Sequence, residues 1–381
     1  MKIGLVARFD NQWAAGKYYI ENILCALQRH PNQCKVIILT EDGSVVKWSE
    51  KINNPETLSH VALEPKYSVT ERILNALWRS IFKKNAIEKR INHLTVDVVF
   101  PLGKTDEYPF EKLNAKAFWI PDFQEKHYPE NFSNEELALR AAERTKIAQQ
   151  EAPLVLSSRA AKADFLNFFS PAACKTMVLP FAVYNTIPKH LSQDQVLEKF
   201  KVKKHAYFIC PNQFWKHKNQ MVIIRAAALM KELMPELVFN ILFTGKEDGF
   251  KGEGLAEECK KACEEYNLNA KIHFLGFIDR TDLLVLIKNA SALLQSSLFE
   301  GWNTSIEDAK SLNCPVIASA LDVHKEQLPN HTLLDPHDET LWANAMIEQL
   351  LNHAQVSFNY EQEQARFEQL LLRTMHEIAD S

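Results

Sequence analysis

The chain has 381 residues, of which 46% are hydrophobic and 24% are charged. This length is typical of two globular domains with ample buried cores, and this composition excludes a disordered chain. The 44 basic and 48 acidic side chains leave a net charge of −4, which argues against a dedicated nucleic-acid binder because such proteins carry a basic surface.

In the first half of the chain, short apolar runs alternate with amphipathic helical stretches, the pattern of a parallel sheet covered by helices. The apolar runs predict strands at 3–7, 35–40, 96–101, 117–120 and 154–157. Helices are predicted at 16–29 and 133–151, and the second begins with the capping box Ser133-x-x-Glu136. Residues 1–8 have the pattern of a strand rather than of a signal peptide, and no apolar run approaches the length of a membrane span. We therefore expect a cytoplasmic protein.

Between residues 68 and 94, apolar side chains recur at helical spacing beside six basic and two acidic side chains. The favoured interpretation is a helix whose apolar face packs in the core of the first domain. The alternative is a basic amphipathic helix that makes peripheral contact with the inner face of an anionic membrane.

A domain boundary is predicted near residue 182, where an apolar run ends and a polar stretch follows as far as Ser192. This boundary gives an N-terminal domain of residues 1–182 and a C-terminal domain of residues 183–381. The second half repeats the strand and helix pattern, with strands predicted at 207–211, 237–244, 272–275, 292–295 and 316–319. A last helix, at about 359–380, is expected to pack back on the first domain. Open parallel sheets of this kind bind ligands at the carboxyl ends of their strands.

The seven cysteines include no Cys-x-x-Cys pair, which indicates a reduced compartment rather than a disulfide framework or a zinc site. Cys259 and Cys263 are spaced to share a helix face, but no nearby histidines complete a metal site. The chain also has no Asp-x-Asp triplet at a predicted strand end, no Gly-x-Gly-x-x-Gly and no Walker-type loop. We expect neither a bound metal nor a cofactor.

The segment 297–309 carries the most informative pattern. Glu300 follows an apolar strand, the chain turns at Gly301, a helix is predicted to begin at Thr304, and Asp308 lies one turn into it. A capping box formed by Thr304 and Glu307 is expected to cap this helix. The free amides of its first turn are suited to a diphosphate, whereas carboxylates accept hydrogen bonds from neutral hydroxyls.

A second polar loop, residues 211–219, follows the first strand of the second half. It contains Gln213, Lys216 and Lys218. Fixed cations at a strand end can stabilise the negative charge of a bound anion. A solvated basic loop before the helix at 220–233 is the alternative.

The segment 297–309 resembles the acidic motif of family 4 retaining glycosyltransferases, the group 1 type, in which glutamates eight residues apart flank a glycine-containing turn. Glu300 and Asp308 occupy these two positions, so the second acid is an aspartate here. The resemblance continues in register through 314–319 and 322–326. In the 211–219 loop, Lys218 occupies the family's lysine position and Gln213 occupies the position of its arginine.

The resemblance implies the GT-B fold, two Rossmann-like doubly wound domains that face a central cleft. It implies that Glu300 contacts the transferred sugar, that Asp308 contacts the ribose, and that Lys218, helped by Gln213 or Lys216, holds the diphosphate. It also places the donor against the turn that leads into the helix, which consists of Gly301, Trp302, Asn303, Thr304 and Ser305.

Three further loops carry candidate site residues, and those of Gly276 and Asp122 match parts of the family pattern. Gly245 follows one predicted strand, and Gly276 with Phe277 follows the next, in the register of the segment whose backbone meets the nucleotide base. Each glycine either lets the backbone approach a ligand or permits a turn. Asp122 follows a strand of the first domain where many members carry a His-Asp pair, and Pro121 replaces the histidine.

These observations predict a metal-independent retaining glycosyltransferase that moves a sugar from a nucleoside diphosphate sugar to a glycan or lipid-linked acceptor, in polysaccharide or glycoconjugate assembly. Glu300, Lys218 and Asp122 are the predicted catalytic residues. Two alternatives remain: a nucleotide-sugar epimerase, and a non-catalytic domain that binds a nucleotide-sugar or a partner enzyme.

Overall fold

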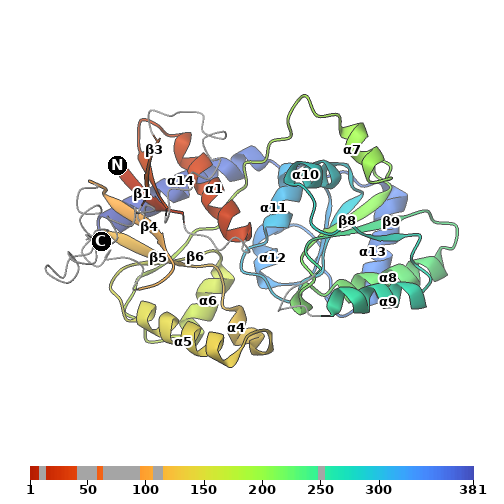
Figure 1. Cartoon of the computed structure of the whole chain (residues 1–381), viewed down its shortest axis with the longest axis horizontal. Helices are drawn as coiled ribbons and strands as arrows, with labels where there is room; N and C mark the ends of the chain where they lie inside the picture. Colours follow the sequence, from red (N-terminus) through yellow and green to blue (C-terminus); the bar gives the residue numbers. More distant parts are fainter. Residues whose placement is uncertain (8–13, 41–57, 63–94, 106–114, 248–253) are drawn as a thin grey trace, which may run out of the picture. The chain divides into compact units, whose positions relative to one another are not determined.

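The computed structural model describes residues 1–7, 14–40, 58–62, 95–105, 115–247 and 254–381. The chain forms two compact units (Figure 1). Unit 1 comprises Met1–Phe123, Ala138–Ala182 and Glu361–Ser381, and unit 2 comprises Gln124–Leu137 and Val183–Tyr360. The chain therefore passes from unit 1 to unit 2 between Ala182 and Val183, and it returns after Tyr360. The helix predicted at 68–94 lies outside the described residues.

Unit 1 is built on a parallel sheet with the strand order β3-β2-β1-β4-β5-β6-β7. The strands are β1 (Lys2–Val6), β2 (Lys35–Thr40), β3 (Leu58–Ala62), β4 (Val98–Leu102), β5 (Lys116–Ile120), β6 (Leu154–Leu156) and β7 (Thr176–Val178). Among the described residues of this unit, the helices are α1 (Ala14–Gln28), most of α5 (Asn134–Ala148), α6 (Arg159–Phe168) and nearly all of α14 (Tyr360–Ala379). The winding of the sheet reverses between β1 and β4, as in a doubly wound fold.

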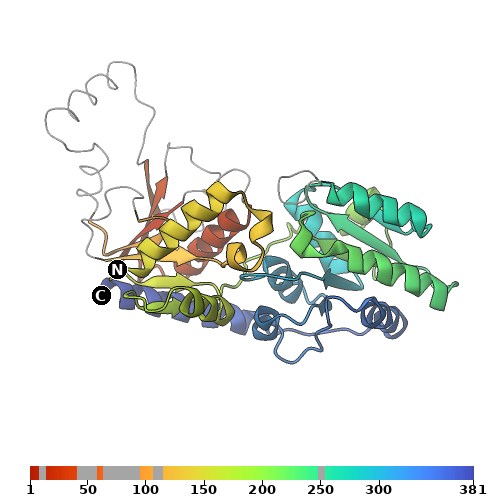
Figure 2. The same ribbon diagram turned by 90° about the horizontal axis from the view of Figure 1, so that it is seen from below.

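The C-terminal helix α14 packs on unit 1, although its sequence follows the whole of unit 2. Figure 2 shows it in blue at the C-terminal end of the chain. Leu371, Met375 and Ile378 on this helix are fully buried. Glu368 accepts a hydrogen bond from His30 Nε2 at 3.0 Å, and Glu377 pairs with Lys175 at 2.9 Å. An apolar stripe and polar contacts thus attach the end of the chain to the unit in which it begins.

Unit 2 is built on a parallel sheet with the strand order β10-β9-β8-β11-β12. The strands are β8 (Tyr207–Pro211), β9 (Asn240–Thr244), β10 (Ile272–Phe274), β11 (Ala292–Gln295) and β12 (Val316–Ala318). Since β8 pairs with β9 on one side and with β11 on the other, the winding reverses between β8 and β11. This reversal is the point at which open α/β sheets characteristically bind ligands.

Helices cover both faces of this second sheet (Figure 1). One face packs against α8 (Gln220–Leu233), α9 (Leu255–Glu265) and α13 (Glu339–Asn352), around the fully buried Trp342. The other face packs against α7 (Gln193–Lys199), α10 (Arg280–Asn289) and α11 (Thr304–Ser311), around Ile209, Leu286 and Ile306. The remaining short helices of unit 2 are α4 (Gln124–His127), η4 (Pro129–Asn131), η5 (Lys216–Lys218) and α12 (Asp322–Gln327).

The predicted fold class, two doubly wound α/β domains, is confirmed. The strands β8 and β11 have the predicted bounds, and the capping box at the start of α5 is present: Ser133 Oγ accepts from the Glu136 amide at 3.1 Å, and Glu136 accepts from the Ser133 amide at 2.9 Å. The strand β3 was not predicted, because Ser59 and His60 interrupt its apolar residues. In the described part of the chain, no helix combines the length and the apolar character needed to cross a membrane.

Candidate functional site

Two predicted residues, Lys218 and Glu300, meet at the switch point of unit 2. Lys218 ends η5, in the loop after β8, and Glu300 lies in the loop after β11. The Lys218 Nζ donates to Glu300 Oε1 at 2.6 Å, and the two side chains are 13% and 10% exposed. Because β8 and β11 are neighbours in a parallel sheet, their carboxyl-end loops bring together residues that are 82 positions apart in sequence.

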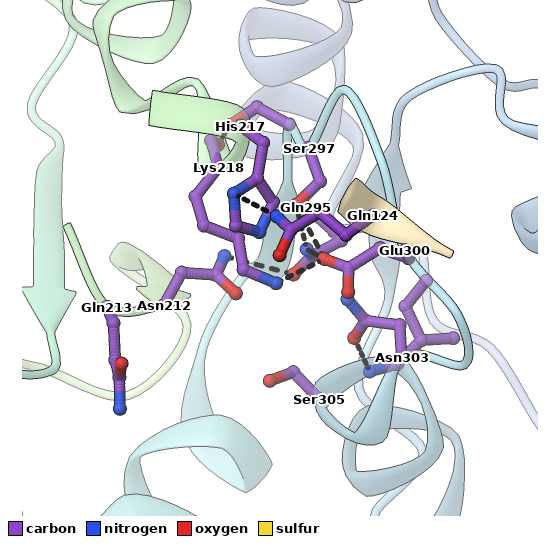
Figure 3. Close-up of polar contacts among 12 residues, drawn as sticks. Gln124, Asn212, Gln213, His217, Lys218, Gln295, Ser297, Glu300, Asn303 and Ser305 are labelled. Carbon is purple, nitrogen blue, oxygen red and sulfur yellow. Dashed lines mark hydrogen bonds and ion pairs between the residues drawn. The ribbon is translucent and has the colours of Figure 1, made fainter. Parts of the chain in front are cut away.

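Glu300 is held asymmetrically. Besides Lys218, the Ser297 hydroxyl donates to Glu300 Oε1 at 2.7 Å and the Gln295 amide donates to it at 3.0 Å. All three bonds end on the same oxygen, as Figure 3 shows. A carboxylate fixed in this way by one oxygen can offer the other to a ligand hydroxyl.

Glu300 is ionised at neutral pH for a clear physical reason. Burial by itself raises the pKa of this carboxyl, but the charges of Lys218 and His217 and the hydrogen bonds from Lys218 and Ser297 outweigh burial, so the pKa lies below its usual value. Glu300 is therefore an acceptor of hydrogen bonds and not a general acid.

Gln295, which sequence reasoning missed, links Glu300 to the loop after β8. Its side chain is fully buried: Asn212 Nδ2 donates to Gln295 Oε1 at 3.1 Å, and Gln295 Nε2 donates to Ser297 Oγ at 2.7 Å as well as to Glu300. A signal was present in the sequence, since Gln295 is the one polar residue in the strand Ala-Leu-Leu-Gln and it lies at the carboxyl end. A buried amide needs such partners to offset its desolvation.

The segment 124–137 precedes the predicted boundary but contacts this site in unit 2. Gln124 Nε2 lies 2.7 Å from Nδ1 of the buried His217. Tyr128 donates its hydroxyl to the Leu298 carbonyl at 3.4 Å, and its ring packs edge-on against Phe299. These contacts explain why the segment belongs to unit 2. Asp122 lies just before it, in unit 1, after the carboxyl end of β5.

The other two candidate residues of the 211–219 loop, Gln213 and Lys216, differ from Lys218 in position. Figure 3 shows the Gln213 side chain directed away from the Lys218 and Glu300 side chains. Lys216, the first residue of η5, is exposed. In the structure, the cation of this loop that contacts Glu300 is Lys218.

The predicted capping box of α11 is wrong. The N-cap is Asn303, whose Oδ1 accepts from the Ile306 amide at 2.9 Å, and Gln327 bonds both the amide and the carbonyl of Asn303. Glu307 is instead 1% exposed and accepts from Lys310 at 3.2 Å and from the Tyr360 hydroxyl at 2.8 Å. Gln327 also donates to this carboxylate, at 2.8 Å. Because these three donors hold the Glu307 side chain in the core, it does not cap the start of the helix.

The helix still begins at Thr304, as predicted, and its first turn lies at the sheet edge where Lys218 lies. Ser305 Oγ contacts the Pro211 carbonyl at 3.4 Å, so the turn formed by 301–305 adjoins the end of β8. Gly301 is buried and Trp302 is partly buried in that turn. The first turn of α11 and the loop that carries Lys218 therefore lie at the same edge of the sheet, and a helix start is suited to bind an anion.

Asp308, on α11, forms an ion pair that was not predicted. Its carboxylate is bound by Arg280, the first residue of α10, and by Asn185, in the segment before α7. The Asp308 side chain is 2% exposed and that of Arg280 is 24% exposed. The acid that was expected to contact a ribose is thus covered by a cation.

The glycines at 245 and 276 join the loops after β9 and β10. The Gly245 amide donates to the Gly276 carbonyl at 2.8 Å. Both have positive φ, and a Cβ on residue 245 would lie 2.5 Å from the carbonyl oxygen of Asn212. Gly245 is therefore required by backbone packing against the loop after β8. Phe277, which follows, is 67% exposed.

His324 is a further buried polar residue near Glu300, on α12. It lies 2.8 Å from the Ser319 carbonyl through Nδ1, so Nδ1 carries the proton and Nε2 is an acceptor without a partner in the described structure. Burial lowers its pKa below the usual value, and the charge of Glu300 opposes this effect. Among the described residues, no group of three or more His, Cys, Asp and Glu side chains could hold a metal ion.

Comparison with known proteins gives two kinds of match. Residues 193–366 match the family model of glycosyl transferases group 1. The O-antigen chain mannosyltransferase RfbU of Salmonella typhimurium is 29% identical over 171 residues, 44% of this chain and 44% of that protein. The putative glycosyltransferase EpsD of Bacillus subtilis is 28% identical over 199 residues, 50% of this chain and 49% of its own. The matches thus span about half or less of these relatives.

Solved structures match the chain over nearly its whole length. Anabaena Alr3699/HepE in complex with UDP and glucose has a TM-score of 0.64 at 16% identity and covers 99% of this chain and 97% of its own. A glycosyltransferase from Rickettsia africae has a TM-score of 0.65 at 18% identity and covers 99% and 97%. WaaG, a glycosyltransferase involved in lipopolysaccharide biosynthesis, has a TM-score of 0.57 at 14% identity and covers 100% and 95%. The chain has the GT-B fold of these proteins.

Proposed function

We propose that this protein is a retaining glycosyltransferase that moves a sugar from a nucleoside diphosphate sugar to a hydroxyl of a glycan or lipid-linked acceptor. The observation that carries the proposal is the Lys218 and Glu300 pair at the switch point of unit 2, inside the segment that matches the group 1 family. One side chain supplies a fixed cation and the other a fixed anion at the same strand-end edge, which suits a ligand with both phosphates and hydroxyls.

The diphosphate would bind between the Lys218 ammonium and the first-turn amides of α11. As the bond between the anomeric carbon and the phosphate oxygen breaks, negative charge grows on the leaving diphosphate. Lys218 and the helix amides stabilise that charge. In the free protein the Lys218 charge is offset by Glu300, so a bound diphosphate competes for Lys218 and releases Glu300 to the sugar hydroxyls.

Retention needs no protein nucleophile in this mechanism. The acceptor oxygen attacks the anomeric carbon on the face that the diphosphate leaves, and its proton passes to the departing phosphate oxygen. The products are the new glycoside and the nucleoside diphosphate. Glu300, whose pKa is lowered, stays ionised throughout and holds the sugar through hydrogen bonds.

The names of the relatives support a proposal for the acceptor and the cellular setting. RfbU is an O-antigen chain mannosyltransferase and WaaG takes part in lipopolysaccharide biosynthesis. We propose that this protein transfers a hexose in surface polysaccharide or glycoconjugate assembly, in the cytoplasm, at the inner face of the membrane where lipid-linked acceptors are presented. Asp122 is proposed to act on the acceptor side.

No divalent metal is needed in this proposal, because amides and a lysine neutralise the diphosphate. Transfer should therefore continue in excess EDTA. A strict requirement for manganese or magnesium, restored when the ion is added back, would contradict this part of the proposal.

The experiment that tests the function is a thermal-shift screen of UDP, GDP, dTDP and ADP and of their sugars, followed by transfer assays with glycan and lipid-linked acceptors. We expect one nucleoside diphosphate to raise the melting temperature of the protein, and the corresponding nucleoside diphosphate sugar to serve as the donor in the transfer assays. Interconversion of the sugar without an acceptor would favour an epimerase. Binding without turnover, in keeping with the neutral Gln213 at the family's arginine position, would favour a non-catalytic binding domain.

A further inference from the structure

Asp308 has almost no capacity left for a ligand. Its Oδ1 accepts from Arg280 Nη2 at 2.5 Å and from Asn185 Nδ2 at 2.9 Å, and its Oδ2 accepts from Arg280 Nη1 at 2.7 Å. A carboxylate offers about four lone-pair sites, and three are in use. Its side chain is 2% exposed. A ribose hydroxyl that approached Asp308 would first have to displace a bidentate guanidinium.

Arg280 is the accessible member of this pair, with 24% of its side chain exposed. It begins α10, directly after the loop that contains Gly276 and the exposed Phe277. The guanidinium is thus more accessible to a ligand than the carboxylate is. Arginine offers only donors, so the ligand atoms in contact would be oxygens that accept hydrogen bonds.

The guanidinium is held on two sides. Arg280 Nη2 donates to Asn185 Oδ1 at 3.0 Å as well as to Asp308. Asn185 in turn donates to Ser311 Oγ at 2.9 Å, on the same helix as Asp308. The three side chains come from the segment before α7, from α10 and from α11. Such a frame fixes the plane of the guanidinium, which is the condition for directional hydrogen bonding by arginine.

We propose that Arg280 is the residue that contacts the nucleoside of the donor at this edge, and that Asp308 and Asn185 position it. The inference rests on the glycosyltransferase function proposed above and deepens it. The Arg280 N–H groups donate to ribose and base oxygens, whereas Asp308 acts through Arg280 without touching the ligand. The second acid of the motif thus orients the Arg280 guanidinium, which donates the hydrogen bonds to the ligand, and does not itself accept one from the ligand.

Asp308 either contacts a ribose hydroxyl directly or acts only by positioning Arg280. These two roles predict different changes in affinity when a ribose hydroxyl is removed. If Asp308 accepted a hydrogen bond from a ribose hydroxyl, the affinity lost when that hydroxyl is removed would persist in Arg280→Ala, where Asp308 remains. If Asp308 acts only through Arg280, Asp308→Asn weakens binding in the presence of Arg280 and has no further effect in Arg280→Ala. A double-mutant cycle separates the two cases.

The experiment is calorimetric titration of UDP, GDP, dTDP and ADP, and of the 2′-deoxy and 3′-deoxy forms of whichever binds, into the wild type and the variants R280A, R280K, D308N, N185A and R280A/D308N. We expect Arg280→Ala to lower the affinity for the nucleoside diphosphate that binds by about tenfold or more, as for a lost charge-assisted hydrogen bond. Arg280→Lys should restore only part of this, because an ammonium lacks the planar fork. Arg280→Ala should match R280A/D308N within about twofold.

The outcomes separate this inference from the proposed function. If none of the four diphosphates binds the wild type, the proposed function fails and the inference fails with it. If one binds, but Arg280→Ala leaves its affinity unchanged or leaves the penalty for a missing ribose hydroxyl in place, the inference alone is overturned. Lys199→Ala, which breaks the ion pair between Lys199 on α7 and Asp282 on α10, is the matched control and should leave nucleotide affinity unchanged.

Discussion

The two acids of the 297–309 motif lie eight residues apart and are held in opposite ways. Glu300 receives three hydrogen bonds on one oxygen, and its partner Lys218 is about as buried as it is, at 13% against 10% exposed. Asp308 is bound through both oxygens, and its partner Arg280 is the more exposed side chain. An acid bound on one oxygen keeps the other for a ligand, whereas an acid bound on both has little capacity left for one. Spacing alone does not distinguish these roles.

Loss of the Glu300 charge should have the largest effect. In Glu300→Gln we expect turnover to fall by about a hundredfold or more, the magnitude seen when a preorganised polar group is removed from a reacting centre. Binding of the bare nucleoside diphosphate should be retained, since Lys218 no longer has a competing anion beside it. Steady-state kinetics and calorimetry measure the two quantities. Asp282→Asn, which removes an acid of similar exposure at 14%, is the control. A loss of bare nucleotide affinity as large as the loss of turnover would contradict the comparison.

Loss of the Lys218 charge should affect binding directly. Lys218→Ala should make the binding free energy of the bare nucleoside diphosphate less favourable by about 1.5 to 3 kcal/mol, the value of a charge-assisted hydrogen bond. The pKa of Glu300 should also rise, because burial is then opposed by fewer charges. Calorimetry on a variant shown to be folded by circular dichroism tests this. Unchanged affinity would remove Lys218 from the phosphate site.

Gln295 tests whether Glu300 needs its fixed orientation. Gln295→Leu keeps a similar volume but removes the amide that links Asn212 to Glu300. We expect a stability loss of about 1 to 3 kcal/mol, since a buried Asn212 donor loses its acceptor. Turnover should fall more than nucleotide affinity, because the sugar contact and not the phosphate contact is disturbed. If turnover, measured well below the melting temperature, is that of the wild type, Gln295 has only a structural role.

The smallest expected effect concerns His324, whose pKa depends on the charge of Glu300. Its pKa is lowered by burial and is raised by the Glu300 charge. The unfolded chain therefore binds a proton at this histidine more readily than the folded one, so stability is full above about pH 6.5 and is lost as the pH falls below that value. The slope for one such group is at most about 1.4 kcal/mol per pH unit.

Thermal denaturation between pH 7.5 and 5 measures this slope. His324→Asn, which retains a donor for the Ser319 carbonyl, should reduce it. Glu300→Gln should lower the pKa of His324 further and extend the fall to lower pH, whereas Asp308→Asn should leave the profile unchanged. A change of equal size in both acid variants would show that His324 does not distinguish the two acids.

Two Ser/Thr-x-x-Glu patterns show why one local prediction succeeded and another failed. Glu136 lies on a surface helix and returns to the Ser133 amide as predicted. Glu307 is surrounded by Lys310, Gln327 and Tyr360, which reach it from other parts of the fold. The same four-residue pattern therefore caps a helix only where no stronger partner is buried beside it.

The sequence by itself determined the alternation of strands and helices, the bounds of β8 and β11, and the position of Lys218 and Glu300 at the carboxyl ends of those strands. These features depend on periodicity and chain direction, which are local. Only the tertiary structure decided that Gln295 supports Glu300, that Arg280 covers Asp308, and that residues 124–137 contact the loop of Leu298 and Phe299. The reason is physical: a buried polar side chain takes whichever partner the packing brings within hydrogen-bond distance, and sheet order, not sequence spacing, decides which segments become neighbours.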